Sequence, residues 1–322
     1  MYQLKKSTEN ELKKVQSSIK KELATEKIIK EIYEYIFNAE GKKTRALICL
    51  LASKSIDIEP SLRVDLASII ELLHTATLVH DDVVDASELR RGTKSVNQVW
   101  TNSYSVLMGD FIYSKAFILM VKLGIPSILD ELAKATNDIA KGEIIQLELF
   151  ERKQFAELKD LIKVSYLKTG RLFEASAKTG AMLAKRSEKE IKTFGSLGKA
   201  IGIAFQIQDD ILDYETVAVN TGKPSMKDFQ EGKITFPLYF ALQNSSKKDK
   251  KFILENLGKR NLSTKIQNKI YNLIHSTQTQ QNINNLLNEY LKEAQNHLNN
   301  LKNHPCHSEM LNLLKFSKIR KK

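Results

Sequence analysis

Apolar residues recur along most of this chain at the spacing of an α-helix. In residues 9–38 they fall at Leu12, Val15, Ile19, Leu23, Ile28, Ile32 and Ile36. This pattern predicts an amphipathic helix with one buried face. Only 5 prolines and 13 glycines interrupt the 322 residues, which leaves room for long helices and disfavours a sheet with many turns. The sequence therefore predicts an all-α protein.

Two later segments are apolar on almost every side. One helix is expected at about 62–85, with Ser61 as a plausible cap, and another over 191–213. Helices that are apolar all round lie in the centre of a large bundle. Each of these two segments ends abruptly in acidic residues.

The remaining segments are more polar. Residues 220–237 contain Gly and Pro and predict a loop, and the region 244–300 predicts peripheral helices. No linker rich in Pro, Gly or Ser divides the chain, so we expect a single domain over residues 1–322.

The acidic clusters share the pattern Asp-Asp-x-x-Asp, at Asp81, Asp82 and Asp85 and again at Asp209, Asp210 and Asp213. Side chains three and four residues apart share one face of a helix, so these carboxylates repel one another. The negative end of the helix dipole increases the repulsion. Oxygen ligands without a set of Cys or His indicate a hard ion, Mg²⁺ or Ca²⁺. Because Mg²⁺ completes its shell with water and phosphate oxygens, two clusters facing a cavity predict a clamp for a diphosphate.

The alternative is that each cluster is a solvated helix end with local salt bridges. One such cluster would leave that alternative open, but two clusters that each follow a buried helix argue against it.

Basic residues lie beside both clusters. Arg90 and Arg91 follow the first cluster, Lys168 precedes a helix of small residues, and Lys223 and Lys233 follow the second cluster. Arg binds phosphate in a bidentate manner and Lys acts as a point charge. Each residue alone would be ordinary surface charge, but their placement predicts further contacts to phosphate.

The formal net charge is +12, which suits nucleic acid, anionic lipid or acidic small molecules as partners. The charge is spread along the chain, except in the basic tail Lys315–Lys322, so we expect most of it to hydrate the surface. Cys49 and Cys306 have no paired or metal-like spacing, and no stretch is apolar enough to span a membrane. The N-terminal residues contain no apolar signal core. We therefore expect a soluble, cytoplasmic protein.

Several motifs follow one another in order: Glu71-Leu72-Leu73-His74, His80-Asp81-Asp82-Val83-Val84-Asp85, Arg90-Arg91-Gly92, Trp100, Gly109-Asp110, Gly142-Glu143 with Gln146, Lys168-Thr169, and Phe205-Gln206-Ile207-Gln208-Asp209-Asp210-Ile211-Leu212-Asp213. From Gly41 to Pro237 the chain resembles the trans-polyprenyl diphosphate synthases. The resemblance implies a bundle of about ten or more helices around a large central cavity, of the isoprenoid synthase type. It also implies a homodimer.

The resemblance further implies residue roles. The six aspartates would hold roughly two to three Mg²⁺ ions per active site on an allylic diphosphate. The groups contacting that diphosphate would be Arg90, Lys168, Lys223 and Lys233, with Thr169 and Gln206 lining the reacting centre. The diphosphate of isopentenyl diphosphate would be bound by Lys42, Arg45, His74 and Arg91. Here the chain has Glu40-Gly41-Lys42-Lys43-Thr44-Arg45-Ala46 where the family has Gly-Gly-Lys-x-x-Arg-Pro, so the cations remain while a Gly and the Pro do not.

The implied reaction is head-to-tail condensation of isopentenyl diphosphate onto the allylic substrate through an allylic carbocation. Ala76 and Thr77 lie roughly 6–7.5 Å before Asp81 along a helix, where a bulky aromatic residue stops chain growth in this family. Because both are small, we expect a long all-trans product, around octaprenyl, for a quinone side chain. A plug deeper down, at Phe117 or Met120, is the alternative.

Three other functions stay open. A geranylgeranyl diphosphate synthase would share the reaction, and a class I terpene cyclase would share one aspartate motif but consume no isopentenyl diphosphate. A basic helical module that binds nucleic acid or membrane would explain the charge but not the six carboxylates. We therefore expect no nucleic acid partner, and at most a transient contact of the tail with a membrane surface during product release.

Overall fold

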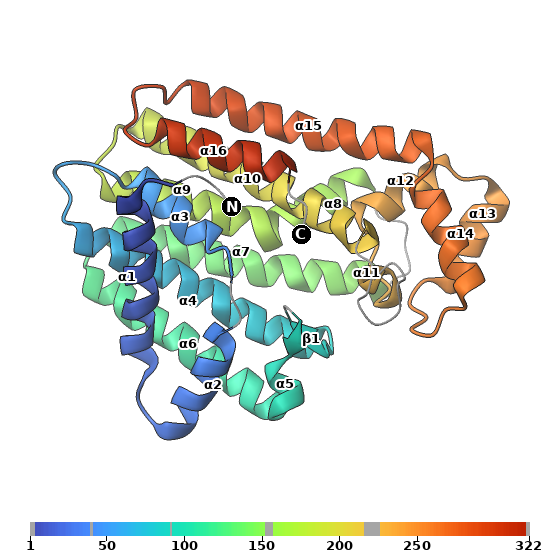
Figure 1. Cartoon of the computed structure of the whole chain (residues 1–322), viewed down its shortest axis with the longest axis horizontal. Helices are drawn as coiled ribbons and strands as arrows, with labels where there is room; N and C mark the ends of the chain where they lie inside the picture. Colours follow the sequence, from blue (N-terminus) through green and yellow to red (C-terminus); the bar gives the residue numbers. More distant parts are fainter. Residues whose placement is uncertain (1–3, 39–40, 91, 152–156, 216–225, 320–322) are drawn as a thin grey trace. The chain divides into compact units, whose positions relative to one another are not determined.

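The computed structural model describes residues 4–38, 41–90, 92–151, 157–215 and 226–319 (Figure 1). These residues form helices joined by short connections, and the prediction of an all-α fold is confirmed. The helices are α1 (Lys6–Leu23), α2 (Lys27–Asn38), α3 (Thr44–Ala52), α4 (Pro60–Val84), α5 (Val96–Val99), α6 (Asn102–Leu123), α7 (Pro126–Glu151), α8 (Leu158–Ser165), the π-helical turn η1 (Tyr166–Gly170), α9 (Arg171–Leu183), α10 (Glu188–Glu215), α11 (Lys227–Gln230), α12 (Phe236–Asn244), α13 (Lys247–Asn256), α14 (Thr264–Ile274), α15 (Thr277–Asn299) and α16 (His307–Ile319). A short hairpin pairs β1 (Leu89–Arg90) with β2 (Thr93–Lys94) in antiparallel register.

Two predicted element boundaries differ from the structure. Residues 9–38 form two helices, because α1 ends at Leu23 and α2 begins at Lys27. The segment 220–237 is not all loop, since it contains α11 and the start of α12. Pro237 lies in the first turn of α12, where a helix does not need the missing N–H. The proline that predicted a loop therefore starts a helix.

The described chain forms two compact units, each built from separate stretches of sequence. The first contains the residues up to 136 together with 172–198 and 298–312, and the second contains 137–171, 199–297 and the residues from 313. The boundaries fall within long helices such as α7 and α10. The single domain expected for the chain stays a prediction.

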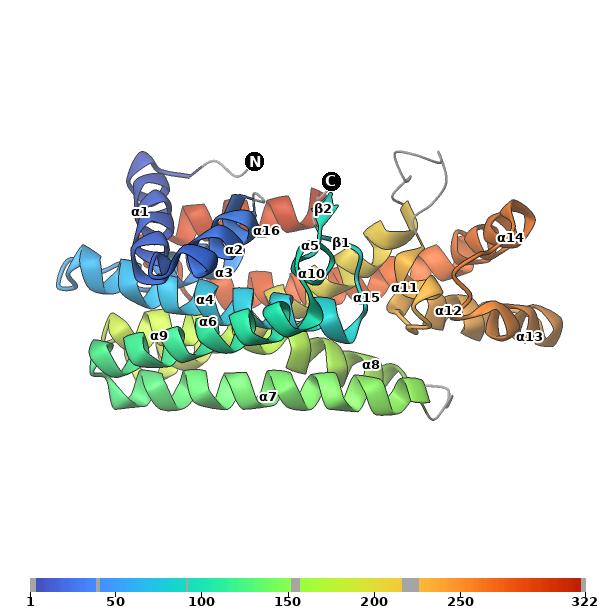
Figure 2. The same cartoon turned by 90° about the horizontal axis from the view of Figure 1, so that it is seen from below.

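In the first unit, α4 is the central helix. It packs against α1, α3 and α6, and α4 and α6 lie side by side in both views (Figure 1 and Figure 2). Nearly every side chain of α4 from Val64 to Ala76 is buried, which confirms the prediction of a helix buried on all sides. A similarly close approach joins α9 to α3, where a Cβ on Gly180 would lie 2.7 Å from the carbonyl oxygen of Cys49.

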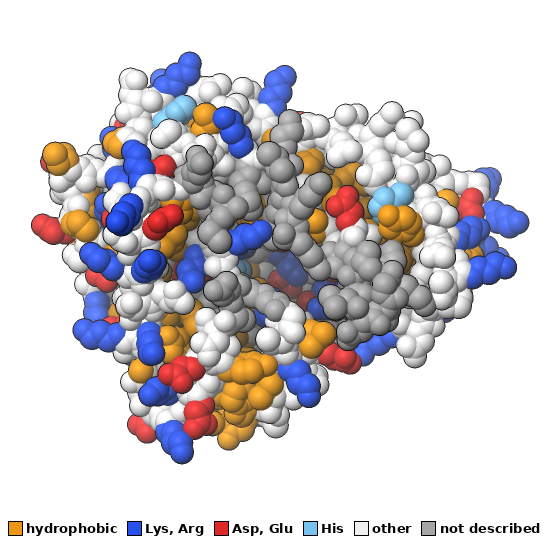
Figure 3. All heavy atoms as spheres, in the orientation of Figure 1, with side chains coloured by type: hydrophobic (Ala, Val, Ile, Leu, Met, Phe, Trp, Pro, Cys, Tyr) orange, Lys and Arg blue, Asp and Glu red, His pale blue; other side chains and the backbone are white. Residues whose placement is uncertain are grey.

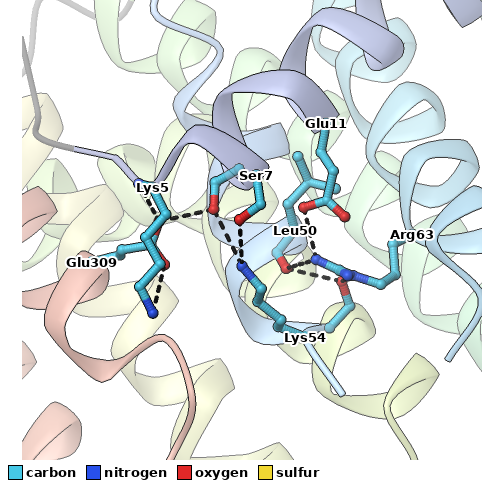
Figure 4. Close-up of polar contacts among 9 residues, drawn as sticks. Lys5, Ser7, Glu11, Leu50, Lys54, Arg63 and Glu309 are labelled. Carbon is cyan, nitrogen blue, oxygen red and sulfur yellow. Dashed lines mark hydrogen bonds and ion pairs between the residues drawn. The ribbon is translucent and has the colours of Figure 1, made fainter. Parts of the chain in front are cut away.

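A buried polar cluster ties the first helix of this unit to the last (Figure 4). Arg63 of α4 forms an ion pair with Glu11 of α1 at 2.9 Å, and both side chains are buried. Glu309 of α16 accepts hydrogen bonds from the backbone N–H of Lys5 at 3.0 Å and from the hydroxyl of Thr8 at 2.8 Å. These bonds satisfy polar groups that would be costly to bury alone, and they fix the start of the chain to residues near its end.

The second unit has two apolar clusters. In one, Ile203 and Ile207 of α10 pack with Phe236 of α12 and Leu287 of α15. The other is formed by residues of α10 to α14 and of the connections between these helices: Tyr214, Met226, Phe229, Leu238, Ala241, Leu242, Ile253, Leu262, Ile270 and Ile274. These clusters hold the C-terminal part of α10, which contains the second aspartate cluster. Among the described helices, none has the length and apolar character needed to cross a membrane.

Candidate active site

The first aspartate cluster lies at the C-terminal end of α4. Both carboxylate oxygens of Asp82 accept from Nε of Arg90 at 2.8 Å, and the Asp82 side chain is 2% exposed. Arg90 belongs to β1, which is paired with β2 in the short hairpin. Asp81 and Asp85, the latter at the C-cap, are half-buried. The first and last carboxylates of this cluster therefore reach solvent, while the middle one is committed to Arg90.

The second cluster shows the same division. Asp210 is 5% exposed and accepts from Nε2 of Gln206 at 2.7 Å and from the backbone N–H of Phe236 at 3.2 Å. Burial, and then the nearby Asp228 carboxylate, raise the pKa of Asp210 well above its ordinary value. Asp209 and Asp213 are half-buried. Consecutive residues of a helix point about 100° apart, which allows the middle residue of each cluster to be buried while the two outer residues are half-buried.

A hydrogen-bonded chain orients the predicted Gln206. The hydroxyl of Thr169 donates to Oε1 of Gln206 at 2.7 Å, and the amide of Gln206 donates to Asp210. Because its carbonyl accepts and its NH₂ donates, the amide is fixed in one orientation. The structure therefore brings together two residues predicted to line the reacting centre and one aspartate.

Lys168 and Thr169 both lie in η1. The ammonium of Lys168 contacts Glu143 of α7 at 2.7 Å and also donates to Oε1 of Gln146. A Cβ on Gly142 would lie 2.7 Å from Cβ of Leu167, so only glycine lets this turn approach α7 so closely. Single π-helical turns are rare and occur frequently at functional sites. The sequence placed Lys168 and Thr169 before a helix but did not predict the π turn.

Asp213 binds the start of α11. Its two oxygens accept from the backbone N–H groups of Lys227 at 3.1 Å and Asp228 at 3.0 Å. Burial, and then the Asp213 carboxylate, raise the pKa of Asp228 to about 7. Lys233 forms an ion pair with Glu231 at 2.9 Å. Asp228 and Glu231 were not predicted from the sequence, where only their position between Lys223 and Lys233 sets them apart.

The residues expected to bind isopentenyl diphosphate are partly assembled. Nη1 of Arg45 lies 3.0 Å from Nε2 of His74, and the guanidinium stacks over the ring of Phe173 at 4.5 Å. A guanidinium only donates, so Nε2 of His74 accepts. Glu71 accepts from the backbone N–H of Ala46 at 3.1 Å, which fixes the start of α3. Lys42 is exposed, while Arg91 and Lys223 lie outside the described residues.

The two residues expected to set product length differ in exposure. Ala76 has no exposed surface. Thr77 is half-buried, and its hydroxyl donates to the carbonyl oxygen of His74 at 2.7 Å. The deeper candidates also differ, since Met120 is buried and Phe117 is 37% exposed. Thr77 is therefore the residue of the predicted pair whose side chain reaches accessible space.

The carboxylates fit a divalent metal that is bound together with phosphate. Within the described residues, no three Asp, Glu, His or Cys side chains gather into a complete metal site. Mg²⁺ commonly takes only one or two carboxylates and fills its shell with water and substrate phosphate oxygens. The half-buried pairs Asp81 with Asp85 and Asp209 with Asp213 supply oxygen donors of this kind.

An all-α fold in which two long helices each contain an Asp-Asp-x-x-Asp cluster is that of a metal-dependent prenyltransferase. The sequence model of the family described as "Polyprenyl synthetase" matches residues 26–274, and the chain belongs to that family. The octaprenyl diphosphate synthase of Escherichia coli (strain K12) is 40% identical over 219 residues, which is 68% of each protein.

Solved structures show the same fold. A decaprenyl diphosphate synthase from Rhodobacter capsulatus matches with a TM-score of 0.89 and 29% identity, over 98% of both chains. A polyprenyl synthase from Caulobacter crescentus CB15, complexed with calcium and isoprenyl diphosphate, matches with a TM-score of 0.89 and 30% identity, over 98% of this chain and 96% of that one. The predicted isoprenoid synthase type of fold is confirmed.

Proposed function

We propose that this protein condenses isopentenyl diphosphate head-to-tail onto an allylic diphosphate and makes a long all-trans polyprenyl diphosphate. The protein is a prenyltransferase of the polyprenyl synthetase family, and its relatives include long-chain synthases. The observation that carries the proposal is the repeated arrangement at the two aspartate clusters, where the middle residue is buried and the two outer residues are half-buried. A protein that only binds a partner does not require a buried aspartate between two half-buried ones, and neither does a solvated helix end.

A divalent metal belongs to this function, and we propose that it is Mg²⁺, with roughly two to three ions per active site. Asp81, Asp85, Asp209 and Asp213 would hold it, while Asp82 and Asp210 keep the two clusters in place. When bound, the metal neutralises the negative charge that builds up on the leaving diphosphate.

The protein's own residues bind and orient the reactants. Lys168 and Lys233 contact the allylic diphosphate once each exchanges its carboxylate partner for phosphate. Arg90 keeps its Nε on Asp82 and contacts the diphosphate through its other N–H groups. Lys42, Arg45 and His74 bind the diphosphate of isopentenyl diphosphate. The C–O bond of the allylic substrate breaks, the double bond of isopentenyl diphosphate attacks the allylic carbon, and a proton then leaves to the released diphosphate. Thr169 and Gln206 line the reacting centre, and no protein nucleophile is needed.

The outer face of α6 supports the proposal of a homodimer. Leu107 and Val121 are 66% and 67% exposed, and Tyr104 and Ile118 are nearly half exposed. These residues recur at helical spacing and form one apolar face, which monomeric proteins rarely leave open to water. A second copy of the chain is the occupant we propose for this face.

The remaining parts of the proposal concern the product and the basic charge. We propose a product of around octaprenyl length for a quinone side chain, with Thr77 and Ala76 beside the growing chain. On the face drawn in Figure 3, Lys and Arg side chains are scattered among other residues, which favours a hydrated surface over a nucleic acid site. A transient membrane contact of the tail stays a prediction, because residues 320–322 lie outside the described residues.

The test is incubation with farnesyl diphosphate, labelled isopentenyl diphosphate and Mg²⁺, followed by chromatography of the dephosphorylated products. We expect a ladder that ends near octaprenyl. A product that stops at geranylgeranyl would keep the reaction and reject the long chain. If isopentenyl diphosphate is not incorporated while a known synthase is active in parallel, the proposal is wrong and a terpene cyclase becomes the better hypothesis.

A further inference from the structure

The imidazole of His80, directly before Asp81, joins α4 to α6. Its Nε2 lies 3.1 Å from the carbonyl oxygen of Val106 and 3.3 Å from Oδ1 of Asp110. Both oxygens only accept hydrogen bonds at these distances, so Nε2 carries a proton and donates. The ring stacks on Tyr113, with centroids 5.8 Å apart and planes at 22°. His80 is thus held by its hydrogen bonds and by its ring, although its side chain is 29% exposed.

A second hydrogen bond runs in the opposite direction beside it. The hydroxyl of Ser105 on α6 donates to the carbonyl oxygen of Val79 at 3.0 Å, and Ser105 has no exposed surface. Two neighbouring residues of α4, Val79 and His80, are therefore bound to α6, one as acceptor and one as donor. The two bonds lie immediately before the first aspartate cluster, where α4 and α6 run side by side (Figure 2).

Gly109 provides the space for the imidazole. A Cβ on this residue would lie 2.2 Å from Nε2 and 2.4 Å from Cδ2 of His80, which is far inside van der Waals contact. Glycine weakens the interior of a helix relative to alanine, and Gly109 lies well within α6. The close approach of His80 explains why α6 has a glycine at this position.

We propose that His80 and Ser105 are positioning residues, which fix the last turn of α4 against α6 so that Asp81 and Asp85 present their carboxylates to the metal in a set geometry. The inference rests on the proposed function. The carboxylates repel one another and lie at the unfavourable end of the helix, so this turn needs outside support to hold its shape before a cation arrives. A preorganised ligand pair binds metal more tightly than one that must be ordered on binding.

Two substitutions of His80 separate its hydrogen bond from its ring. His80→Phe keeps a ring above Gly109 and beside Tyr113 but removes the donor, while His80→Gln restores an N–H donor at a similar reach. Because a single hydrogen bond is lost, we expect His80→Phe to raise the Mg²⁺ concentration for half-maximal activity about fivefold. His80→Gln should recover most of that loss. The KM for isopentenyl diphosphate should stay unchanged in both variants, because its proposed ligands lie elsewhere.

A binding measurement without turnover gives the second readout. Farnesyl thiodiphosphate, which reacts very slowly, is titrated by calorimetry into the wild type and each variant at several Mg²⁺ concentrations. We expect the Mg²⁺ dependence of binding to shift with His80→Phe and Ser105→Ala. Ser114→Ala is the matched control, because its hydroxyl donates to the backbone carbonyl oxygen of Asp110 within α6 itself.

The outcomes separate a positioning role from a structural one. A variant that loses thermal stability while its Mg²⁺ dependence matches the wild type would overturn the inference. If His80→Phe does not fold, Ser105→Ala decides, since it removes one hydroxyl and leaves no buried donor behind. An inactive wild type would reject the proposed function, whereas an active wild type with unshifted variants would reject this inference alone.

Discussion

The pair formed by Asp82 and Arg90 predicts an unequal response to the loss of each partner. Arg90→Met leaves the Asp82 carboxylate, 2% exposed, without its guanidinium. Removing one partner of a buried ion pair costs about 3–5 kcal/mol. Because the Arg90 side chain is 32% exposed, we expect a smaller loss, about 2–3 kcal/mol in the free energy of unfolding. Asp82→Asn keeps an oxygen that can accept from Arg90, and it should cost about 1 kcal/mol.

Urea unfolding of the two single variants and the double variant measures these values. All samples need the same protein concentration, because association adds to the stability of a dimer. The double variant should lose less than the sum of the single losses, with a coupling of about 1 kcal/mol. A loss below about 0.5 kcal/mol for Arg90→Met would refute the argument from burial.

The same variants test whether Asp82 is an anchor or a metal ligand. If it is an anchor, Asp82→Asn should change the Mg²⁺ concentration for half-maximal activity much less than Asp81→Asn does. Equal shifts in the two variants would show that Asp82 binds the metal, and the assignment made from its burial would be wrong.

Three further predictions concern product length, the π turn and pH. Thr77→Phe should shorten the product seen by chromatography, and an unchanged product would reject the place of Thr77 beside the growing prenyl chain. Ala76→Phe overfills a buried position and should lower the free energy of unfolding by about 1–3 kcal/mol. Gly142→Ala should reduce kcat with little change in expression, because its Cβ would press on Leu167 of the π turn, and a fully active variant would contradict the 2.7 Å approach. Burial, and then Arg186, lower the pKa of His304 to about 4, below the value of about 6.5 in an unfolded chain. Between these two pKa values only the unfolded chain takes up the proton. The free energy of unfolding should therefore fall as pH drops from 6.5 to 4, by on the order of 3 kcal/mol in total. Urea unfolding across that range should show a smaller dependence of stability on pH for His304→Gln than for the wild type.

Much of the fold followed from the spacing of apolar residues. The buried character of α4 and the acidic end of α10 were both predicted, because helical periodicity and local charge are properties of neighbouring residues. The break between α1 and α2 was not predicted, because the segments on both sides of it repeat their apolar residues at helical spacing. The step of five residues from Leu23 to Ile28 departs from that spacing and coincides with the break.

The candidate site was predictable in composition but not in orientation. Helical spacing shows which carboxylates share a side of the helix. The partner of the buried Asp82 comes from β1, which the chain reaches after leaving α4 through Ala86, whose φ is +47°. In the same way, Asp210 is buried by contacts with Phe236, which is distant in sequence. Asp228 escaped prediction because it belongs to no regular spacing and is defined only by its contacts with Asp213.

Because of the π turn, the contact between Thr169 and Gln206 depends on how many residues the turn contains as well as on which residues they are. Tyr166–Gly170 contains one residue more than an α-helical turn would require. Deleting Tyr166 or Leu167 would allow an unbroken α-helix, and the Thr169 side chain would then rotate by about 100° about the axis of α8, away from Gln206. Point substitutions in this turn leave that geometry in place, whereas a deletion that removes no functional side chain at all would still dismantle the chain of hydrogen bonds to Asp210. A relative that is one residue shorter here should therefore orient its glutamine by some other contact.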